Sequence, residues 1–284
     1  MKRSLVYIVL IAPYILMLSC NKDKPVVIHP TTEDVILKDV RYGNHERQKM
    51  DVYLPSERDR LTTKIVVFIH GGGWIAGSKD DLPVDVNNFQ TLKEQFPGFA
   101  LVALNYRLAE SSENQYPAAE EDIIRAMNHV LANLESYQLA PEIYMTGGSA
   151  GAHLAALYTL KHHANGRVKG CIGVSGAYNL VSLYQIGNSE AKAALKAFLG
   201  GTPDQQLRSY EQASPINFVS STAPKFLILH GKEDPLTPIG QANEFMAALE
   251  IKGVSHSSFT YSGGHGIPSE HLAKSFGYIR DFLK

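Results

Sequence analysis

The sequence contains little cysteine, little net charge and no long basic run. Only Cys20 and Cys171 occur among 284 residues, so neither a disulfide framework nor a cysteine-based metal site is expected. The 27 Lys and Arg residues nearly balance the 28 Asp and Glu residues, which leaves a formal net charge of −1. This balance argues against nucleic acid as the main partner. No repeat, low-complexity block or metal-ligand pattern stands out, and we expect neither a cofactor nor a metal.

The sequence contains enough hydrophobic residues to form a large core. Hydrophobic residues make up 44% of the chain and charged residues 19%, as in an ordinary globular protein. A length of 284 residues accommodates one large α/β domain or two smaller ones. Composition thus indicates a folded domain, and the motifs must indicate its function.

The first 19 residues have the pattern of an export signal. Lys2 and Arg3 precede an apolar run over residues 5–18, which is too short for a comfortable transmembrane helix. Cys20 follows the run directly, and the arrangement resembles a bacterial lipoprotein signal that is cleaved before Cys20 and lipidated on its thiol. A plain secretory signal and an uncleaved anchor are the alternatives. We expect an exported chain that a lipid anchor alone holds to the membrane.

The segment after Cys20 is predicted to be a tether. Residues 20–34 are polar and contain Pro25 and Pro30, which favours an extended linker over a packed element. Cys171 lies in an apolar run and is expected to be a buried core thiol. The folded domain is therefore expected over residues 35–284.

Apolar runs alternate with helical patterns from residue 35 onwards. Residues 35–42 and 49–54 predict an antiparallel hairpin. Further strands are expected at residues 64–70, 99–106, 143–146, 168–174, 225–230 and 258–261, and helices at residues 85–96, 117–137, 152–160, 240–249 and 268–283. The alternation predicts an α/β fold with a mostly parallel central sheet and helices on both faces. Residues 179–214 are less regular and predict a lid or a wall of the site, without a separate domain.

A glycine-rich turn forms the centre of this arrangement. The motif Gly147-Gly148-Ser149-Ala150-Gly151 follows an apolar run and opens an Ala/Leu-rich helix. In such a strand–turn–helix elbow small residues must flank the serine, and the helix directs free N–H groups towards it. Ser149 is therefore the candidate nucleophile; an incidental serine in a glycine turn is the alternative.

A base and an acid follow in the chain order that this fold requires. His265 lies between glycines after the last predicted strand, and Asp234 lies in a turn after residues 225–230. A serine hydroxyl needs a nearby base, and the base needs an orienting carboxylate. Glu233 competes with Asp234, which we favour because Pro235 holds it in an extended turn. Ser149, His265 and Asp234 are thus the candidate catalytic residues.

A second glycine run supplies candidate oxyanion donors. His70-Gly71-Gly72-Gly73-Trp74 follows the buried strand at residues 64–70. Backbone N–H groups can surround an oxyanion only where side chains are absent, and we assign the donors to Gly72, Gly73 and Ala150. His70 is expected to be a structural hydrogen-bonding residue.

These motifs resemble those of an α/β-hydrolase of the hormone-sensitive-lipase and carboxylesterase group, and more narrowly bacterial esterases of the feruloyl/acetyl-esterase type. The matching segments are His70-Gly71-Gly72-Gly73-Trp74, Asn105-Tyr106-Arg107-Leu108, Tyr116-Pro117-Ala118-Ala119, residues 147–153, Asp234 and His265. The resemblance implies the same triad and oxyanion hole. The sequence departs from the family pattern at Asn105, where Asp is usual, and at Ala109, where Pro is usual. Strands begin soon after the tether, which indicates a minimal cap.

The sequence therefore predicts a serine carboxylesterase for short acyl esters, with acetyl or feruloyl groups on plant polysaccharide as candidate substrates. Trp74, Tyr106 and Tyr178 are expected to line the substrate site. An amide-cleaving relative, either a peptidase or a formamidase, shares the acyl-transfer chemistry and stays open. A non-catalytic binding protein on the same scaffold is a third alternative. The sequence leaves the oligomeric state open.

Overall fold

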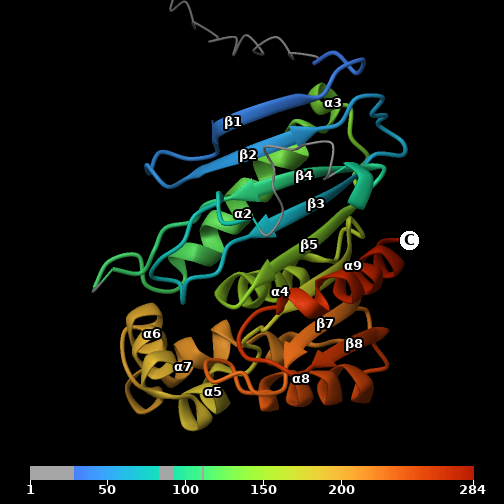
Figure 1. Ribbon diagram of the computed structural model, residues 1–284. Helices are drawn as coiled ribbons and strands as arrows, with labels where there is room; N and C mark the ends of the chain where they lie inside the picture. Colours follow the sequence, from blue (N-terminus) through green and yellow to red (C-terminus); the bar gives the residue numbers. More distant parts are fainter. Residues whose placement is uncertain (1–28, 83–92, 111) are drawn as a thin grey trace, which may run out of the picture.

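An eight-stranded sheet runs through the computed structural model, which describes residues 29–82, 93–110 and 112–284 (Figure 1). The expected signal, Cys20 and most of the helix predicted at residues 85–96 lie outside these residues. The strands are β1 (Val35–Arg41), β2 (Lys49–Leu54), β3 (Lys64–Ile69), β4 (Phe99–Leu104), β5 (Ile143–Gly148), β6 (Val168–Val174), β7 (Lys225–Gly231) and β8 (His256–Tyr261). Every strand expected from the sequence is confirmed within a few residues.

The strand order is β1-β2-β4-β3-β5-β6-β7-β8, from the top to the bottom of Figure 1. Strand β2 pairs antiparallel with β1 and β4, whereas the pairs from β4 to β8 are all parallel. A short loop can join β1 and β2 only because they are antiparallel; the parallel strands need crossovers, and helices supply them. The mostly parallel sheet with an antiparallel N-terminal hairpin is therefore confirmed.

Both faces of the sheet are covered, as the continuous apolar strands require. In β7, Phe226 and Ile228 pack into the core on one face, and Leu227 and Leu229 pack on the other. The helices are α2 (Ala118–Ala132), α3 (Leu134–Tyr137), α4 (Ala150–His162), α5 (Leu180–Ile186), α6 (Ser189–Leu199), α7 (Pro203–Ala213), the 3₁₀ helix η1 (Pro215–Phe218), α8 (Gly240–Ile251) and α9 (Ser269–Leu283). Helix α4 is buried all round, and Cys171 is buried beneath it as expected.

The helix predicted at residues 117–137 is two helices. Asn133 leaves helical geometry, with φ −109° and ψ 10°, and separates α2 from α3. Its side-chain amide donates to the His129 carbonyl at 2.7 Å. This local hydrogen bond competes with the helical pattern, which explains why apolar periodicity alone overestimated the helix length.

Residues 179–214, expected to be a lid or a wall, form α5, α6 and α7 between β6 and β7. The three helices lie together beside the carboxyl ends of the parallel strands, at the lower left of Figure 1. Asn179 and Asn188 cap α5 and α6 by accepting backbone N–H groups of Ser182 and Ala191. Thr202 and a residue three positions later form a capping box at the start of α7.

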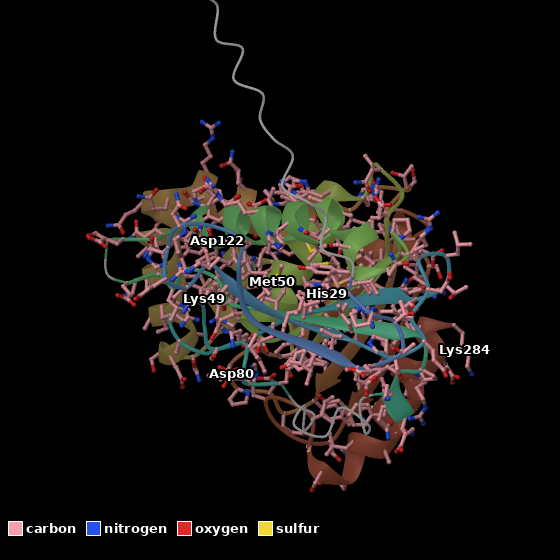
Figure 2. All side chains as sticks on the ribbon, turned by 90° about the horizontal axis from the view of Figure 1, so that it is seen from above. His29, Lys49, Met50, Asp80, Asp122 and Lys284 are labelled. Carbon is pink, nitrogen blue, oxygen red and sulfur yellow. The ribbon has the colours of Figure 1, made fainter. Side chains whose placement is uncertain are left out.

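The parallel strands all end on one side of the sheet and all begin on the opposite side. Seen from above, Lys49 and Asp80 lie towards the edge where the parallel strands end, and Lys284 lies towards the other (Figure 2). Across residues 29–82, 93–110 and 112–284, none of the helices combines the length and the apolar character needed to span a membrane.

Candidate active site

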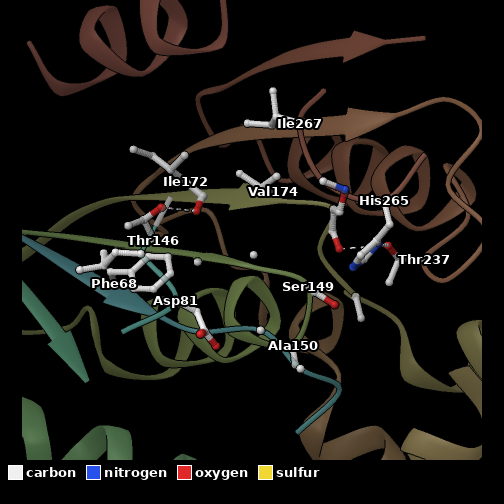
Figure 3. Close-up of a pocket in the computed structure, with 18 of the residues that line it drawn as sticks. Phe68, Asp81, Thr146, Ser149, Ala150, Ile172, Val174, Thr237, His265 and Ile267 are labelled. Atoms are coloured by element: carbon white, nitrogen blue, oxygen red, sulfur yellow. Dashed lines mark hydrogen bonds between the residues drawn. The ribbon is translucent and has the colours of Figure 1, made fainter. Parts of the chain in front are cut away.

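The loops that follow β3, β5, β7 and β8 meet at one edge of the sheet, because the carboxyl ends of parallel strands share that edge. They open onto a cavity of about 800 Å³ (Figure 3). Several site residues that we predicted from the sequence line this cavity: Gly72, Gly73, Trp74, Ser149, Ala150 and His265. The fold therefore gathers segments that are nearly 200 residues apart in the chain.

Ser149 occupies a strained turn between β5 and α4. Its backbone has φ 55° and ψ −121°, a sparsely populated conformation for a residue with a side chain. A Cβ atom on Gly151 would lie 2.0 Å from the Ile69 carbonyl oxygen, so only glycine fits there. The Ser149 N–H donates to the Val174 carbonyl at 2.8 Å and fixes the turn to β6. The Ser149 hydroxyl is thus held out at the cavity surface.

His265 and Asp234 form a direct hydrogen-bonded pair. The His265 Nδ1–H donates to Asp234 Oδ2 at 2.8 Å and lies 3.1 Å from Oδ1. This bond selects the tautomer whose Nε2 is free to accept a proton. Glu233 instead accepts the Gly263 N–H, so Asp234 is the carboxylate that contacts the histidine.

The Asp234 carboxylate is buried and charged. Burial alone would raise its pKa, but the hydrogen bond and charge of His265 and the hydrogen bonds of Thr237 outweigh burial and lower the pKa to about 2. The N–H groups of Leu236 and Thr237 each donate to Oδ1 at 2.9 Å. The side chain therefore remains an anion that can stabilise a protonated imidazole beside it.

Ser149 and His265 face each other across the cavity. Figure 3 shows the serine hydroxyl directed towards the imidazole ring. No hydrogen bond joins the two described side chains, although both line the same cavity. Such bonds are often long in an unliganded site and tighten when substrate binds.

The loop after β3 presents backbone donors to the same space. Gly72, Gly73 and Trp74 have φ values of 96°, 59° and 64°. A Cβ on Gly72 would lie 2.2 Å from the Ala76 carbonyl oxygen, so the turn requires glycine. Among the described residues, neither the Gly72 nor the Gly73 N–H has an acceptor. Ala150 opens α4, where the first N–H groups have no intrahelical partner.

His70 and Arg47 hold this glycine loop in place through hydrogen bonds. His70 Nδ1–H donates to the Gly71 carbonyl at 2.8 Å, and His70 Nε2 lies 3.2 Å from Arg47 Nη2. Arg47 also donates to the Gly77 carbonyl at 2.7 Å. Burial lowers the pKa of His70 to about 4, so the ring is neutral. Sequence reasoning missed Arg47, because it lies in the β1–β2 loop outside any motif.

Trp74 links the glycine loop to the helices of the wall. It is 4% exposed, lines the cavity and stacks on Phe198 with ring centroids 4.7 Å apart. Its indole N–H donates to His153 Nδ1 at 3.1 Å, and His153 Nε2–H donates to the Ala213 carbonyl at 2.7 Å. His153 is thus a hydrogen-bonding residue of the core.

Tyr106 and Tyr178 do not line the cavity, contrary to the prediction. Tyr106 is fully buried, stacks on His70 at 4.3 Å and donates its hydroxyl to the His70 carbonyl. Tyr178 is also buried, and its ring stacks on Phe245 at 4.2 Å. Both rings fill the layer behind the site, and Ala177 reaches the cavity instead of Tyr178.

Helices α5 and α6 form the remaining wall with mostly small and apolar side chains. Their contributions are Leu183, Glu190, Ala191, Ala193 and Ala194. Apolar residues of the sheet and α9, among them Phe68, Leu101, Ile172 and Phe276, continue the lining. Asp81 and Glu190 are the carboxylates of the described lining, which contains neither Lys nor Arg.

The arrangement contains the components of acyl transfer: a hydroxyl, an imidazole paired with a buried carboxylate, and converging N–H donors. Within the residues that the structure describes, no group of three or more His, Cys, Asp or Glu is placed to hold a metal ion.

Comparison with known proteins places the chain among hydrolases. The probable carboxylic ester hydrolase LipM of Mycobacterium tuberculosis (strain ATCC 25618 / H37Rv) is 31% identical over 238 residues, which cover 79% of this chain and 53% of LipM. The kynurenine formamidase of Danio rerio is 29% identical over 230 residues, or 78% of this chain and 71% of that protein. This chain spans about half the length of the first curated relatives that it matches.

A solved structure described as a truncated form of carbohydrate esterase from gut microbiota has a TM-score of 0.75 to this chain. The two are 21% identical, and the superposition covers 90% of this chain and 99% of that one. At this identity the likeness concerns the fold. The family model BD-FAE matches residues 50–249, well over half of the sequence. The chain therefore belongs to the BD-FAE family and has the α/β-hydrolase fold.

Proposed function

We propose that this chain is a serine ester hydrolase. The observation that carries the proposal is the Asp234–His265 pair, joined at 2.8 Å and facing Ser149 across one cavity. Ser149 Oγ attacks the ester carbonyl carbon while His265 Nε2 takes the hydroxyl proton. The carbonyl oxygen becomes an oxyanion, which the N–H groups of Gly72, Gly73 and Ala150 stabilise.

The tetrahedral intermediate then collapses. The bond to the alcohol oxygen breaks, the alcohol leaves with the proton from His265, and the acyl group stays on Ser149. Water then attacks the acyl-enzyme: His265 takes a proton from the water, and the water oxygen bonds to the acyl carbon. The bond between that carbon and Ser149 Oγ breaks, Oγ receives the proton from His265, and the acid leaves. The buried Asp234 carboxylate orients His265 and stabilises its protonated form in both halves.

The lining of the cavity favours uncharged acyl groups. Ala194 of α6 stands beside the glycine loop and leaves space there, and the carboxylates of Asp81 and Glu190 disfavour an anionic substrate. We propose short acyl esters as substrates, with acetyl or feruloyl groups on plant polysaccharide as candidates. The structural neighbour described as a carbohydrate esterase supports a saccharide-borne substrate.

Amide cleavage is the second candidate, because a curated relative is a kynurenine formamidase at 29% identity. The same attack on a carbonyl carbon would release an amine in place of an alcohol. We rank it second because an ester is the more reactive carbonyl compound for a site of this geometry.

Hydrolysis of p-nitrophenyl acetate, butyrate and octanoate by the full chain tests the proposal. We expect the acetate to have the highest kcat/KM, and Ser149→Ala to lose kcat by about 10⁴–10⁶-fold. Ser220→Ala, which changes a serine outside the cavity lining, is the matched control. Turnover retained by Ser149→Ala would refute the proposal. Faster cleavage of p-nitroacetanilide than of p-nitrophenyl acetate would favour the amide-cleaving alternative.

We further propose that the chain is exported and anchored by a lipid on Cys20. The proposal is supported by the basic start, the apolar run over residues 5–18 and the cysteine directly after it. Mass spectrometry of the mature protein tests it: a diacylated Cys20 at the new N-terminus is expected. A mature chain that is cleaved without lipid would instead indicate a plain secretory signal.

A further inference from the structure

The end of β6 contacts the loops of all three proposed catalytic residues. The Val174 carbonyl accepts the N–H of Ser149 at 2.8 Å. One residue later, the Ser175 hydroxyl accepts the N–H of Gly266, the neighbour of His265, at 3.1 Å. The Ser175 carbonyl lies 3.0 Å from the hydroxyl of Thr237, which follows Asp234 in the acid loop. Val174 and Ser175 therefore join three separate loops at one point.

Ser175 holds an unfavourable backbone conformation at this point. Its φ is +50°, in the left-handed region, although the residue is not glycine. It is 1% exposed, and its N–H donates to the Leu229 carbonyl of β7 at 2.9 Å. Such strain persists only where the surroundings impose it, and it is concentrated at functional sites. Here the conformation turns the carbonyl to the acid loop and the hydroxyl to the histidine loop.

Thr237 connects Ser175 to the Asp234–His265 pair. Its hydroxyl oxygen lies 2.9 Å from Asp234 Oδ2 and 3.4 Å from His265 Nδ1. The single hydroxyl proton can be donated to the Asp234 carboxylate or to the Ser175 carbonyl. Figure 3 shows Thr237 beside His265 at the cavity.

The histidine loop is held at both backbone polar groups of Gly266, the residue that follows His265. The Gly266 N–H is bound by the Ser175 hydroxyl, and the Gly266 carbonyl accepts the Tyr261 hydroxyl proton at 2.9 Å. Removal of the Ser175 hydroxyl would leave the half-buried Gly266 N–H without this acceptor and remove one of the two hydrogen bonds that hold the loop.

We propose that Ser175 and Thr237 are positioning residues that fix the Asp234–His265 pair relative to Ser149. The inference rests on the proposed function, because it assigns these residues to the same reaction. They act through the geometry of His265 and do not contact the reacting atoms. A displacement of about 1 Å of a catalytic group can cost about 100-fold in rate, so loss of either contact lowers kcat.

Three variants of the full chain test the proposal with p-nitrophenyl acetate. Ser175→Ala removes the acceptor for Gly266, and Thr237→Val removes a hydroxyl while it keeps the branched shape. We expect each to lower kcat by about tenfold and to leave KM within about twofold of the wild type, because positioning acts on the transition state. Thr237→Ser restores the hydroxyl and is expected to restore most of kcat. Thr222→Val, outside the cavity lining, is the control for threonine replacement.

Proton NMR provides a readout that needs no substrate. The hydrogen-bonded Nδ1–H of His265 is expected as a downfield resonance in the wild type and in Thr237→Ser. It is expected to shift or broaden in Ser175→Ala and Thr237→Val. An inactive wild type with these NMR changes would contradict the proposed reaction and leave the positioning intact. Unchanged kcat and an unchanged resonance in both variants would refute the positioning role.

A double-mutant cycle separates positioning from a general loss of structure. In an Asp234→Asn background the pair to be positioned is already broken, so Thr237→Val is expected to have little further effect on kcat. If Thr237 served the fold alone, its replacement would lower kcat by the same factor in both backgrounds, and that result would overturn the proposal.

Discussion

Asp234 combines two structural tasks in one side chain. Its Oδ1 accepts the backbone N–H groups of Leu236 and Thr237, which shapes its own loop, and its Oδ2 accepts the His265 Nδ1–H. A side chain that only capped the following turn would not contact the histidine. The carboxylate thus builds the loop that places it and orients the imidazole from the same position.

Replacement of Asp234 by Asn tests this orienting role at the residue scale. The amide keeps the shape, but its NH₂ group can donate to Nδ1 and select the wrong histidine tautomer. We expect kcat for p-nitrophenyl acetate to fall by about 10³–10⁴-fold with little change in KM. Glu233→Gln is the matched control and should remain close to the wild type, because glutamine still accepts the Gly263 N–H. A larger loss in Glu233→Gln than in Asp234→Asn would reverse the assignment.

The sequence predicted the position of single residues where short-range chemistry decides it. The small residues around Ser149 predicted its turn, and the proline after Asp234 favoured that residue over Glu233 as the one that contacts His265. Tyr106 and Tyr178 were misplaced because the direction of an aromatic ring depends on packing partners such as His70 and Phe245. Arg47 and Ser175 gave no sequence signal, because their hydrogen bonds reach residues that are far away in the chain.

At the scale of elements, α6 forms part of the wall of the cavity beside the glycine loop. Ala194 stands so close to Gly73 that a Cβ built on that glycine would lie 3.3 Å from the alanine methyl group. Both residues line the cavity. The length of the side chain at position 194 therefore limits the space beside the proposed oxyanion donors.

Ala194→Phe is expected to shorten the acyl chain that the site accepts. The larger side chain occupies space that an octanoyl group needs and an acetyl group does not. We expect the ratio of kcat/KM for p-nitrophenyl octanoate over acetate to fall by about tenfold. Lys196→Phe places the same side chain on an exposed position of α6 and is the control. An unchanged ratio in Ala194→Phe would show that this part of α6 does not contact the acyl group.

The inner strands β3, β4, β5 and β7 were predictable because their side chains are buried on both faces, so that their sequences are almost continuously apolar. The helices of residues 179–214 were less visible, since α5 and α6 are short and their caps, Asn179 and Asn188, are recognised only once a helix is assumed. Their position beside the strand ends follows from tertiary packing, which no local sequence pattern indicates.

At the scale of the whole molecule, buried neutral histidines link stability to pH. Burial, reinforced by nearby cationic side chains, lowers the pKa of His70 and of His153 to about 4. An unfolded histidine has a pKa of about 6.5. Between these values the unfolded chain binds more protons than the folded one, so the free energy of unfolding falls as the pH falls from 6.5 to 4.

We expect each of these histidines to contribute a slope of at most about 1.4 kcal/mol per pH unit over that window. His153→Gln can keep both hydrogen bonds without titrating, so its free energy of unfolding should depend less on pH than that of the wild type. Urea unfolding at several pH values between 4 and 7 measures both slopes. Parallel curves for the two proteins would contradict the neutral state of His153. Asp234 adds a further loss between about pH 3.8 and 2, where the carboxyl group is protonated in the unfolded chain but still ionised in the folded one.

The strand order also determines when the proposed chemistry becomes available during folding. Strands β5, β6, β7 and β8 lie side by side in the order in which a ribosome makes them, and His265 follows the edge strand β8. A nascent chain that has folded through β7 already carries the serine elbow, the glycine loop and the acid, but it has no base. The proposed triad is therefore complete only when the last edge strand has joined the sheet, and a chain folded through β7 alone carries a serine without its base.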